Sequence, residues 1–285
     1  MTNFFEYIKT NSSFVKLAFD DLLFAEYTCP IKEAKLPIWS DANYLAYVLS
    51  GRKIWMVDDV SHELKKGDAI FVGKGAHYIE QIFEKEFCLL IFFFPDEYVE
   101  EVLKLVDFRK TKTKTLAKPP KLIPLEVNEP LQIYFQSMAS FFSQEKGPYK
   151  QLLDIKFKEL LVQLLNYQNN PTLISFFDSV VSPPERRFRQ MIESNLQFDI
   201  GIEEYAKMAG MSVSTFKRFF KNVFGSAPGQ YIINSRLELA SLQLKKTDKT
   251  IQEIAYESGF ENPAHFTRMF NKKYKTSPSK YRENN

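Results

Sequence analysis

The stretch "AGMSVSTFKRFFKNVFGSAPGQYI" (Ala209–Ile232) decides the fold of the last third of the chain, because its pattern returns as "SGFENPAHFTRMFNKKYKTSPSKYR" (Ser258–Arg282). Each stretch carries a glycine, then a polar residue suited to beginning a helix, then a stripe of aromatic residues and a later proline. The sequence therefore predicts a duplicated unit of secondary structure in this region.

The two copies carry the same helix signals. Gly210 returns as Gly259 at an offset of 49 residues, and both suit the left-handed conformation that ends a helix. Ser212 and Asn262, at an offset of 50, are good N-caps for a second helix. The pattern of Thr250–Glu253 matches a capping box. The extra residue falls in the expected turn, where it costs little loop-closure entropy. Two helices joined by a short turn form a helix-turn-helix, so we expect this motif twice.

Helical periodicity separates a core side from a solvent side on each second helix. Apolar residues recur at the i, i+3, i+4, i+7 spacing of one helix face. They are Phe216, Phe219, Phe220 and Val223 in the first copy, and Phe266, Met269 and Phe270 in the second. The residues expected to face outward are Ser214, Lys217, Arg218 and Lys221, and then Ala264, Thr267, Arg268 and Asn271. Arg can bind guanine, Asn adenine, Ala and Thr a thymine methyl, and Lys a phosphate. The outward faces are therefore candidates for reading the DNA major groove.

A long amphipathic helix is expected between the two motifs, over 228–246. It would hold the two reading helices about one DNA turn apart, roughly 34 Å, so that both enter successive major grooves. Residues 183–285 carry 17 Lys and Arg against 11 Asp and Glu, or +6, while residues 1–182 carry 21 against 24, or −3. A basic region suits an anionic partner, but soluble domains without such a partner are also basic, so charge alone does not decide the function.

Residues from about 184 to 282 resemble the DNA-binding domain of the AraC/XylS family of bacterial transcription regulators. The segment "IQEIAYESGFENPAHFTRMFNKKYKTSPSKYR" resembles that family's signature almost throughout. The resemblance implies a seven-helix unit that reads asymmetric sites near promoters. It places Ser214, Lys217 and Arg218 in one groove and Thr267 and Arg268 in the other. Pro263 and Ala264 depart from the polar residues that many members have there. His265 lies at the edge of the reading face, where a phosphate or packing role is expected rather than metal binding.

The first 105 residues or so read as short strands with tight turns, a pattern that indicates a small barrel or a sandwich. Segments such as "RKIWMVDDV" and "FCLLIFFF" are rich in β-branched and aromatic residues and are separated by turn signals. Leu49–Gln81 resembles the cupin-type sensory barrel of many family members, through the Gly67–Asp68 turn and the later Gly75-x-His77. The expected fold class is α+β: a cupin-like β-barrel with flanking helices, followed by an all-α DNA-binding domain with two helix-turn-helix motifs joined by a linker helix.

The expected sensory domain lacks the residues of a metal site. Metal cupins resemble one another through an HxH…E set and a later His, which together supply the metal ligands. His62 and His77 are not part of such a set, so neither a metal, a cofactor nor a catalytic residue is expected. Candidate residues lining an effector pocket are Trp55, Phe71, Tyr78 and Phe92, although barrel interiors are usually filled by their own side chains. A helix over 150–167 either forms a dimer contact, as the family resemblance implies, or packs on its own barrel.

We expect three segments along the chain. Residues 1–170 form a sensory and dimerisation domain, with a barrel at about 10–105 and helices at about 129–168. Residues 171–184 form an interdomain linker that ends in the helix-opening "SPPE". Residues 185–285 form the DNA-binding domain, with helix-turn-helix motifs at about 202–224 and 251–274.

The expected function is sequence-specific regulation of transcription, without enzyme activity. We expect an activator that binds double-stranded DNA at a promoter or operator and contacts RNA polymerase, either as a homodimer or as a monomer. An unknown small-molecule or protein effector would control it. Two alternatives stay open: a DNA-repair methyltransferase-type regulator with a methyl-accepting cysteine, and a protein-binding helical module. Cys29 and Cys88 lack metal spacing, and neither a signal peptide nor a membrane-spanning run is evident, so the cytoplasm is expected.

Overall fold

The computed structural model describes residues 1–28, 35–57, 60–82, 87–106, 120–142, 149–167 and 170–283. The chain divides into two compact units, Thr2–Pro183 and Pro184–Asn285, and each is described by itself. Across these described ranges, no helix is both long enough and apolar enough to cross a membrane.

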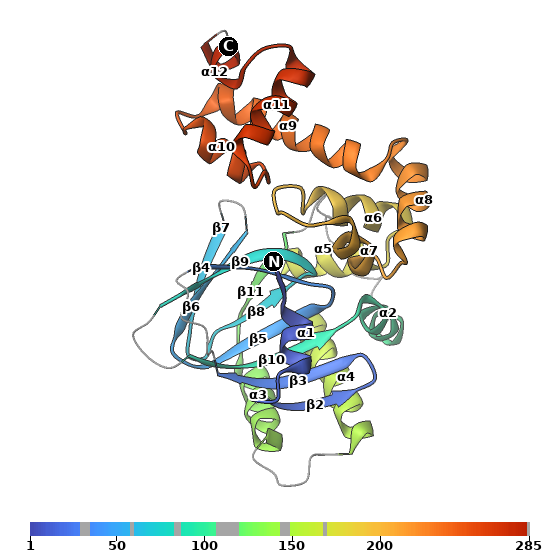
Figure 1. The fold of residues 1–285 in the computed structure, drawn as a ribbon. Helices are drawn as coiled ribbons and strands as arrows, with labels where there is room; N and C mark the ends of the chain where they lie inside the picture. Colours follow the sequence, from blue (N-terminus) through green and yellow to red (C-terminus); the bar gives the residue numbers. More distant parts are fainter. Residues whose placement is uncertain are drawn as a thin grey trace. The chain divides into compact units, whose positions relative to one another are not determined.

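The N-terminal unit contains two β-sheets and helices that cover one of them (Figure 1). The described strands of the first sheet follow in the order β1 (Thr2–Asn3), β4 (Lys35–Ser40), β9 (Gly75–Gln81), β6 (Arg52–Val57) and β7 (Val60–Lys65). Those of the second sheet follow in the order β11 (Leu122–Leu125), β8 (Ala69–Val72), β5 (Asn43–Ser50), β10 (Cys88–Phe94), β3 (Leu22–Thr28) and β2 (Val15–Phe19). Neighbouring strands pair antiparallel, except β1 and β4, which pair parallel.

The expected α+β fold class is confirmed, but the described strands do not close into a barrel, because the two sheets are separate layers. Within the described ranges, no hydrogen-bonded ladder joins one sheet to the other. Their facing sides instead bury one apolar cluster, to which the first sheet contributes Trp55 and the second Ile91. The short helix α1 (Phe4–Thr10) adds Phe4 to the same cluster. Side chains that interdigitate between two layers exclude water without closure of the sheet edges.

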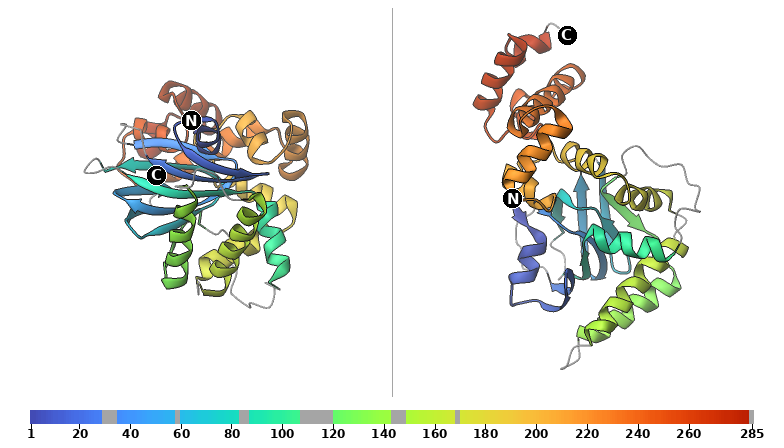
Figure 2. Two further views of the ribbon diagram at one scale, coloured as in Figure 1. Left: turned by 90° about the horizontal axis from the view of Figure 1, so that it is seen from below. Right: turned by 90° about the vertical axis from the view of Figure 1, so that its right-hand side faces the viewer.

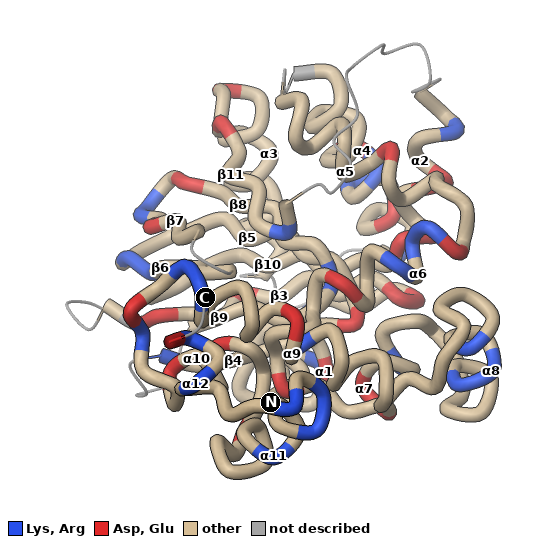
Figure 3. Tube along the Cα trace, turned by 90° about the horizontal axis from the view of Figure 1, so that it is seen from above, with Lys and Arg blue, Asp and Glu red and all other residues tan. Residues whose placement is uncertain are grey.

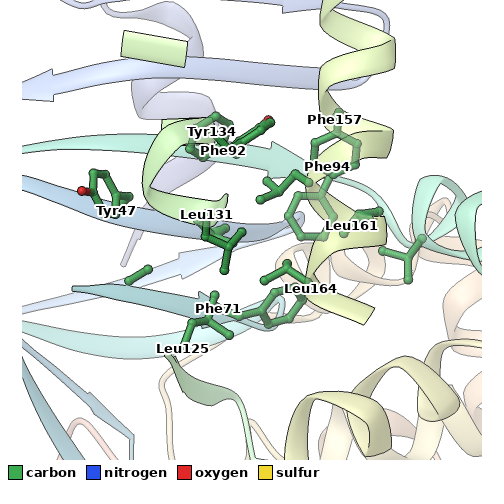
Figure 4. Close-up of a cluster of buried hydrophobic side chains, with 14 of the residues drawn as sticks. Tyr47, Phe71, Phe92, Phe94, Leu125, Leu131, Tyr134, Phe157, Leu161 and Leu164 are labelled. Carbon is green, nitrogen blue, oxygen red and sulfur yellow. The ribbon is translucent and has the colours of Figure 1, made fainter. Parts of the chain in front are cut away.

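The second sheet is apolar on both faces. Along β10, alternate residues from Leu89 to Phe93 pack between the sheets, while those from Leu90 to Phe94 pack on the opposite face. That opposite face is covered by α2 (Asp96–Leu105), α3 (Glu129–Phe142), α4 (Lys150–Tyr167) and α5 (Pro171–Val180). Figure 2 shows helices on one side of the strands, and Figure 4 shows the side chains buried beneath them. The run "FCLLIFFF" is continuously apolar because neither face of its strand meets water.

Most of the expected linker, 171–184, is instead the helix α5, so this part of the prediction is wrong. Asn170 caps the helix by accepting hydrogen bonds from two backbone N–H groups, and Pro171 lies in its first turn. Leu173, Phe177 and Val180 are buried at helical spacing against the second sheet. α5 therefore belongs to the N-terminal unit. The sensory and dimerisation role expected for the N-terminal region, and the DNA-binding role expected for the C-terminal region, stay predictions.

The C-terminal unit is helical. Its seven helices within residues 184–283 are α6 (Pro184–Glu193), α7 (Ile202–Met208), α8 (Val213–Phe224), α9 (Pro228–Lys246), α10 (Ile251–Glu257), α11 (Pro263–Tyr274) and α12 (Pro278–Glu283). α7 with α8, and α10 with α11, form the two helix-turn-helix motifs, and α9 packs against both of them (Figure 1). The 19 residues of α9 correspond to a length of about 28 Å.

Each motif has its own aromatic core. In the first, the ring of Phe188 from α6 lies 5.4 Å from that of Phe216 and 5.8 Å from that of Phe220. In the second, Phe266 and Phe270 are fully buried in a cluster with residues of α9 and α10. The aromatic stripes are therefore core, as the periodicity predicts.

Candidate nucleic-acid interface

Helix α8 is fixed at both ends and along its buried side. The hydroxyl of Ser212 accepts a hydrogen bond from the backbone N–H of Thr215 at 3.3 Å. Gly225 ends the helix in the left-handed region, with φ 72°. Phe216 and Phe220 are fully buried. The residues on the other side are exposed: Ser214, Lys217, Arg218 and Lys221.

Helix α11 repeats this arrangement. The side-chain oxygen of Asn262 accepts hydrogen bonds from the backbone N–H groups of Ala264 at 2.8 Å and His265 at 3.3 Å. Lys275 ends the helix in the left-handed region at φ 59°, where the first copy has a glycine. The outward set consists of Ala264, Arg268 and Asn271, which are exposed, and Thr267, which is half-buried. The second reading helix thus also presents a polar face above a buried aromatic stripe.

The first helix of each motif is held by the predicted signals. In α10, the backbone N–H of Thr250 donates to Glu253 at 2.7 Å, and the backbone N–H of Glu253 donates to the Thr250 hydroxyl at 3.2 Å. The Thr250 backbone N–H and the Thr250 hydroxyl, which donates to the same carboxylate at 2.8 Å, hold the pKa of Glu253 below its ordinary value. Gly210 and Gly259 have φ of 63° and 84°, which confirms their prediction as helix ends. The capping box and both glycine turns are present.

The two exposed faces have the chemistry of a surface for anionic, hydrogen-bonding partners. Arg218 and Arg268 occupy the same position of the repeat and both are exposed. A guanidinium is always charged and offers five N–H donors in a fixed plane, which suits a guanine edge or a phosphate. Figure 3 shows basic residues on both α8 and α11. Contact between these eight outward residues and DNA stays a prediction.

The four residues expected to line one effector pocket do not converge. Phe71 and Phe92 are buried between the second sheet and its helices (Figure 4), whereas Trp55 is buried between the two sheets. Tyr78 is half-buried, with the ammonium of Lys35 4.6 Å from its ring centre. These four residues come from four different strands and two different sheets, so they do not line one common space, and an effector pocket stays a prediction.

His77 belongs to a buried hydrogen-bonded group. The indole N–H of Trp55 donates to the Tyr44 hydroxyl at 3.1 Å, and that hydroxyl lies 2.6 Å from Nε2 of His77. Burial, together with the charge of Lys121, lowers the pKa of His77 to about 3, so the imidazole is neutral. The Tyr44 hydroxyl can accept from Trp55 and still either donate to or accept from Nε2, so the direction of this second hydrogen bond follows from which ring nitrogen carries the proton. Of the described His, Cys, Asp and Glu residues, no three are grouped so as to hold a metal ion.

Two further residues singled out in the sequence have ordinary surroundings. The half-buried thiol of Cys88 donates to a carboxylate oxygen of Glu26 at 3.7 Å. Cys29 lies outside the described residues. The half-buried ring of His265 packs on Phe260, with 6.0 Å between ring centres.

Sequence reasoning misses Arg236, which is buried in the middle of α9 and bonds three backbone carbonyls. A signal for it exists in the sequence. Arg236 falls four residues after Ile232 and four before Ala240, on the stripe that buries this helix. A charged residue within an apolar stripe requires buried partners, and these cannot be identified from one sequence.

The chain matches two protein-family models: the ExsA N-terminal regulatory domain over residues 43–176 and a helix-turn-helix domain over residues 205–284. The virulence regulon transcriptional activator VirF of Yersinia enterocolitica is 24% identical, over 84% of this chain and 88% of its own. The probable transcription factor PqrA of Proteus vulgaris is 38% identical, over 33% of this chain and 78% of its own. Among solved structures, ToxT from Vibrio cholerae aligns over 92% of this chain and 98% of its own, with 13% identity and a TM-score of 0.44.

Proposed function

The chain belongs to the AraC/XylS family of transcription regulators, and from that premise we propose that it activates transcription by binding specific sequences of double-stranded DNA. α8 and α11 enter successive major grooves. The reading residues are Ser214, Lys217, Arg218 and Lys221 on α8, and Ala264, Thr267, Arg268 and Asn271 on α11. Phosphate contacts position the protein and base-edge contacts select the sequence, so the function involves binding alone.

The observation that carries this proposal is the matched pair of exposed faces. A core requirement explains why Phe216 and Phe266 repeat, since both are fully buried. It does not explain why an exposed arginine repeats two residues further along, at Arg218 and Arg268. Two arginines presented by capped, anchored helices supply the pre-organised donors that guanine recognition needs.

The N-terminal unit is proposed to control DNA engagement or dimerisation in response to an effector or a partner protein. The description of the matching N-terminal model as a regulatory domain supports this role. Leu152 and Ile155 of α4 are exposed apolar residues, which suits a contact in a homodimer. The Yersinia enterocolitica relative is a transcriptional activator, which supports an activating role. RNA polymerase is the proposed second partner, and the cytoplasm is the proposed compartment.

Selection of random duplex DNA by the purified full-length protein tests the proposal. We expect enrichment of one asymmetric site of about 20 base pairs that spans two successive major grooves. Affinity for this site should fall steeply as salt rises, because bound Lys and Arg release counterions from the phosphates.

The controls separate base reading from general affinity for DNA. A protein with both Arg218→Ala and Arg268→Ala should retain a salt-dependent affinity for DNA but enrich no site. Enrichment of the same site by this double variant would contradict the assignment of the reading residues. If neither the full chain nor residues 184–285 bind DNA in a salt-dependent manner, the proposed function is wrong and a protein partner takes its place.

A further inference from the structure

Arg236 makes an unusual set of contacts for a residue in the middle of a long helix. Its Nε donates to the carbonyl of Leu196 at 2.7 Å, and its Nη2 donates to the carbonyl of Phe198 at 2.7 Å. Its Nη1 donates to the carbonyl of Gly259 at 2.6 Å. The side chain is 8% exposed. A buried guanidinium is thus satisfied by three backbone acceptors.

These acceptors belong to different halves of the C-terminal unit. Leu196 and Phe198 lie in the segment between α6 and α7, which leads into the first helix-turn-helix motif. Gly259 lies in the turn between α10 and α11, within the second motif. From the helix that connects the two motifs, Arg236 therefore bonds both the segment that leads into the first motif and the turn of the second.

The backbone of the second motif is in close contact at this point. A Cβ atom on Gly259 would lie 2.8 Å from the carbonyl oxygen of Leu196 and 2.9 Å from Nε of Arg236. At the matching position of the first motif, a Cβ on Gly210 would meet no atom within 4 Å. Across the same contact, a hydrogen bond between the carboxyl groups of Asp199 and Glu261 raises the pKa of Glu261. We call the contact of the 196–199 segment, Arg236 and the 259–261 turn the seam.

The seam bears on DNA recognition because two reading helices must meet two grooves together. Inserting one base pair between two half-sites turns one relative to the other by about 34° and shifts it by about 3.4 Å. A protein whose halves are held rigidly rejects such a change, whereas one whose halves move independently accepts it. The planar fork of Arg236 fixes three carbonyls in one geometry, which a lysine ammonium on a flexible stem does not.

We propose that Arg236 is a positioning residue that sets the distance and rotation between α8 and α11, and so allows only one spacing of the two half-sites. This inference rests on the proposed function for its effect on DNA. A residue that only stabilised the fold would weaken binding to every site alike and leave the preference for spacing unchanged.

The first test compares the selected site with the same site carrying one inserted base pair. The insertion should weaken wild-type binding at least about tenfold, equivalent to about 1.4 kcal/mol. In Arg236→Met we expect weaker binding to the parent site but an insertion penalty below about threefold. Arg236→Lys should show an intermediate penalty. A folded Arg236→Met protein with the full wild-type penalty would overturn the proposal.

The second test needs no DNA. Spin labels at Asn222 of α8 and Lys272 of α11, both exposed, report the distance between the two helices in the full-length chain after serine replaces Cys29 and Cys88. The distribution should be narrow in wild type and clearly broader in Arg236→Met. An unchanged width in a folded variant would contradict the seam. The wild-type protein could select no DNA site and still show a narrow distance distribution that broadens in Arg236→Met. In that case the proposed function is wrong, but the inference that Arg236 fixes the two helices relative to each other stands.

A matched pair of glycine variants serves if Arg236→Met does not fold, as judged by circular dichroism. Gly259→Ala and Gly210→Ala both introduce a side chain at positive φ, but only the former presses on the seam. Gly259→Ala should broaden the distance distribution and reduce the insertion penalty, while Gly210→Ala should leave both at wild-type values. Equal behaviour of the two variants would overturn the proposal.

Discussion

Acidification from pH 7 to pH 5 is expected to destabilise the N-terminal unit by about 2 kcal/mol through His77 alone. The pKa of His77 falls from an ordinary 6.5 to about 3 in the folded unit. Between these values the unfolded chain binds a proton that the folded unit excludes. The stability is therefore fully present above about pH 6.5 and is lost as the pH falls. Each pH unit below 6.5 removes about 1.4 kcal/mol, and the step to pH 5 removes about 2 kcal/mol.

Urea unfolding followed by tryptophan fluorescence isolates this effect. The two tryptophans of the chain, Trp39 and Trp55, both lie in the N-terminal unit, so the signal reports that unit alone. His77→Gln removes the buried titrating group, and its free energy of unfolding should vary with pH by less than about half the wild-type amount. His62→Gln, which replaces a half-buried imidazole, is the control and should keep most of the wild-type dependence. Equal pH dependence in His77→Gln and wild type would refute the reasoning, because proton uptake would then belong to other groups.

Replacing Arg218 or Arg268 by alanine is expected to weaken binding to the selected site by about 1–3 kcal/mol in an anisotropy titration, and unchanged affinity in both variants would contradict base reading. Lys275→Gly is expected to stabilise the C-terminal unit by about 0.5–1 kcal/mol. Glycine removes about 1–2 kcal/mol of strain at the left-handed position, but it also makes the unfolded chain more flexible, which offsets about 0.4–1 kcal/mol of that gain. Gly225→Ala should lower the stability of the C-terminal unit by a similar amount. Amide hydrogen exchange in the full-length protein measures both changes, and a Lys275→Gly protein that is less stable than wild type would argue against strain at Lys275. Thr250→Ala should cost about 1 kcal/mol and speed exchange at the start of α10, whereas unaltered exchange there would show that Glu253 holds the turn by itself.

The two helix-turn-helix motifs are predictable from sequence because their signals are local. Ser212 and Asn262 cap the helices that directly follow them, and the aromatic stripes recur within one helix. The same spacing assigns the exposed face on which Arg218 and Arg268 lie. Periodicity alone therefore identifies the candidate reading residues, before any tertiary contact is known.

The remaining features depend on contacts between distant parts of the chain. The separation of the sheets depends on which strand edges pair. The sequence pattern of β10 does not specify this, because both of its faces are apolar and neither is marked as the solvent side. Phe71 and Trp55 for this reason look equivalent in sequence, although they belong to different layers. The acceptors of Arg236 lie 40, 38 and 23 residues away along the chain, beyond the reach of any local pattern.

The doubly apolar second sheet has a consequence for synthesis of the protein on the ribosome. All of its described strands have been synthesised once Leu125 is made, but the helices α3 to α5, which together with α2 cover its outer face, extend to Val180. At about 5–20 residues per second, the outer face waits several seconds for its cover. During that interval the nascent chain exposes an aromatic surface that chaperones bind and that drives aggregation. A product that ends at Leu125 would contain every described strand of this unit but lack the helices α3 to α5, so we expect it to aggregate through the uncovered face.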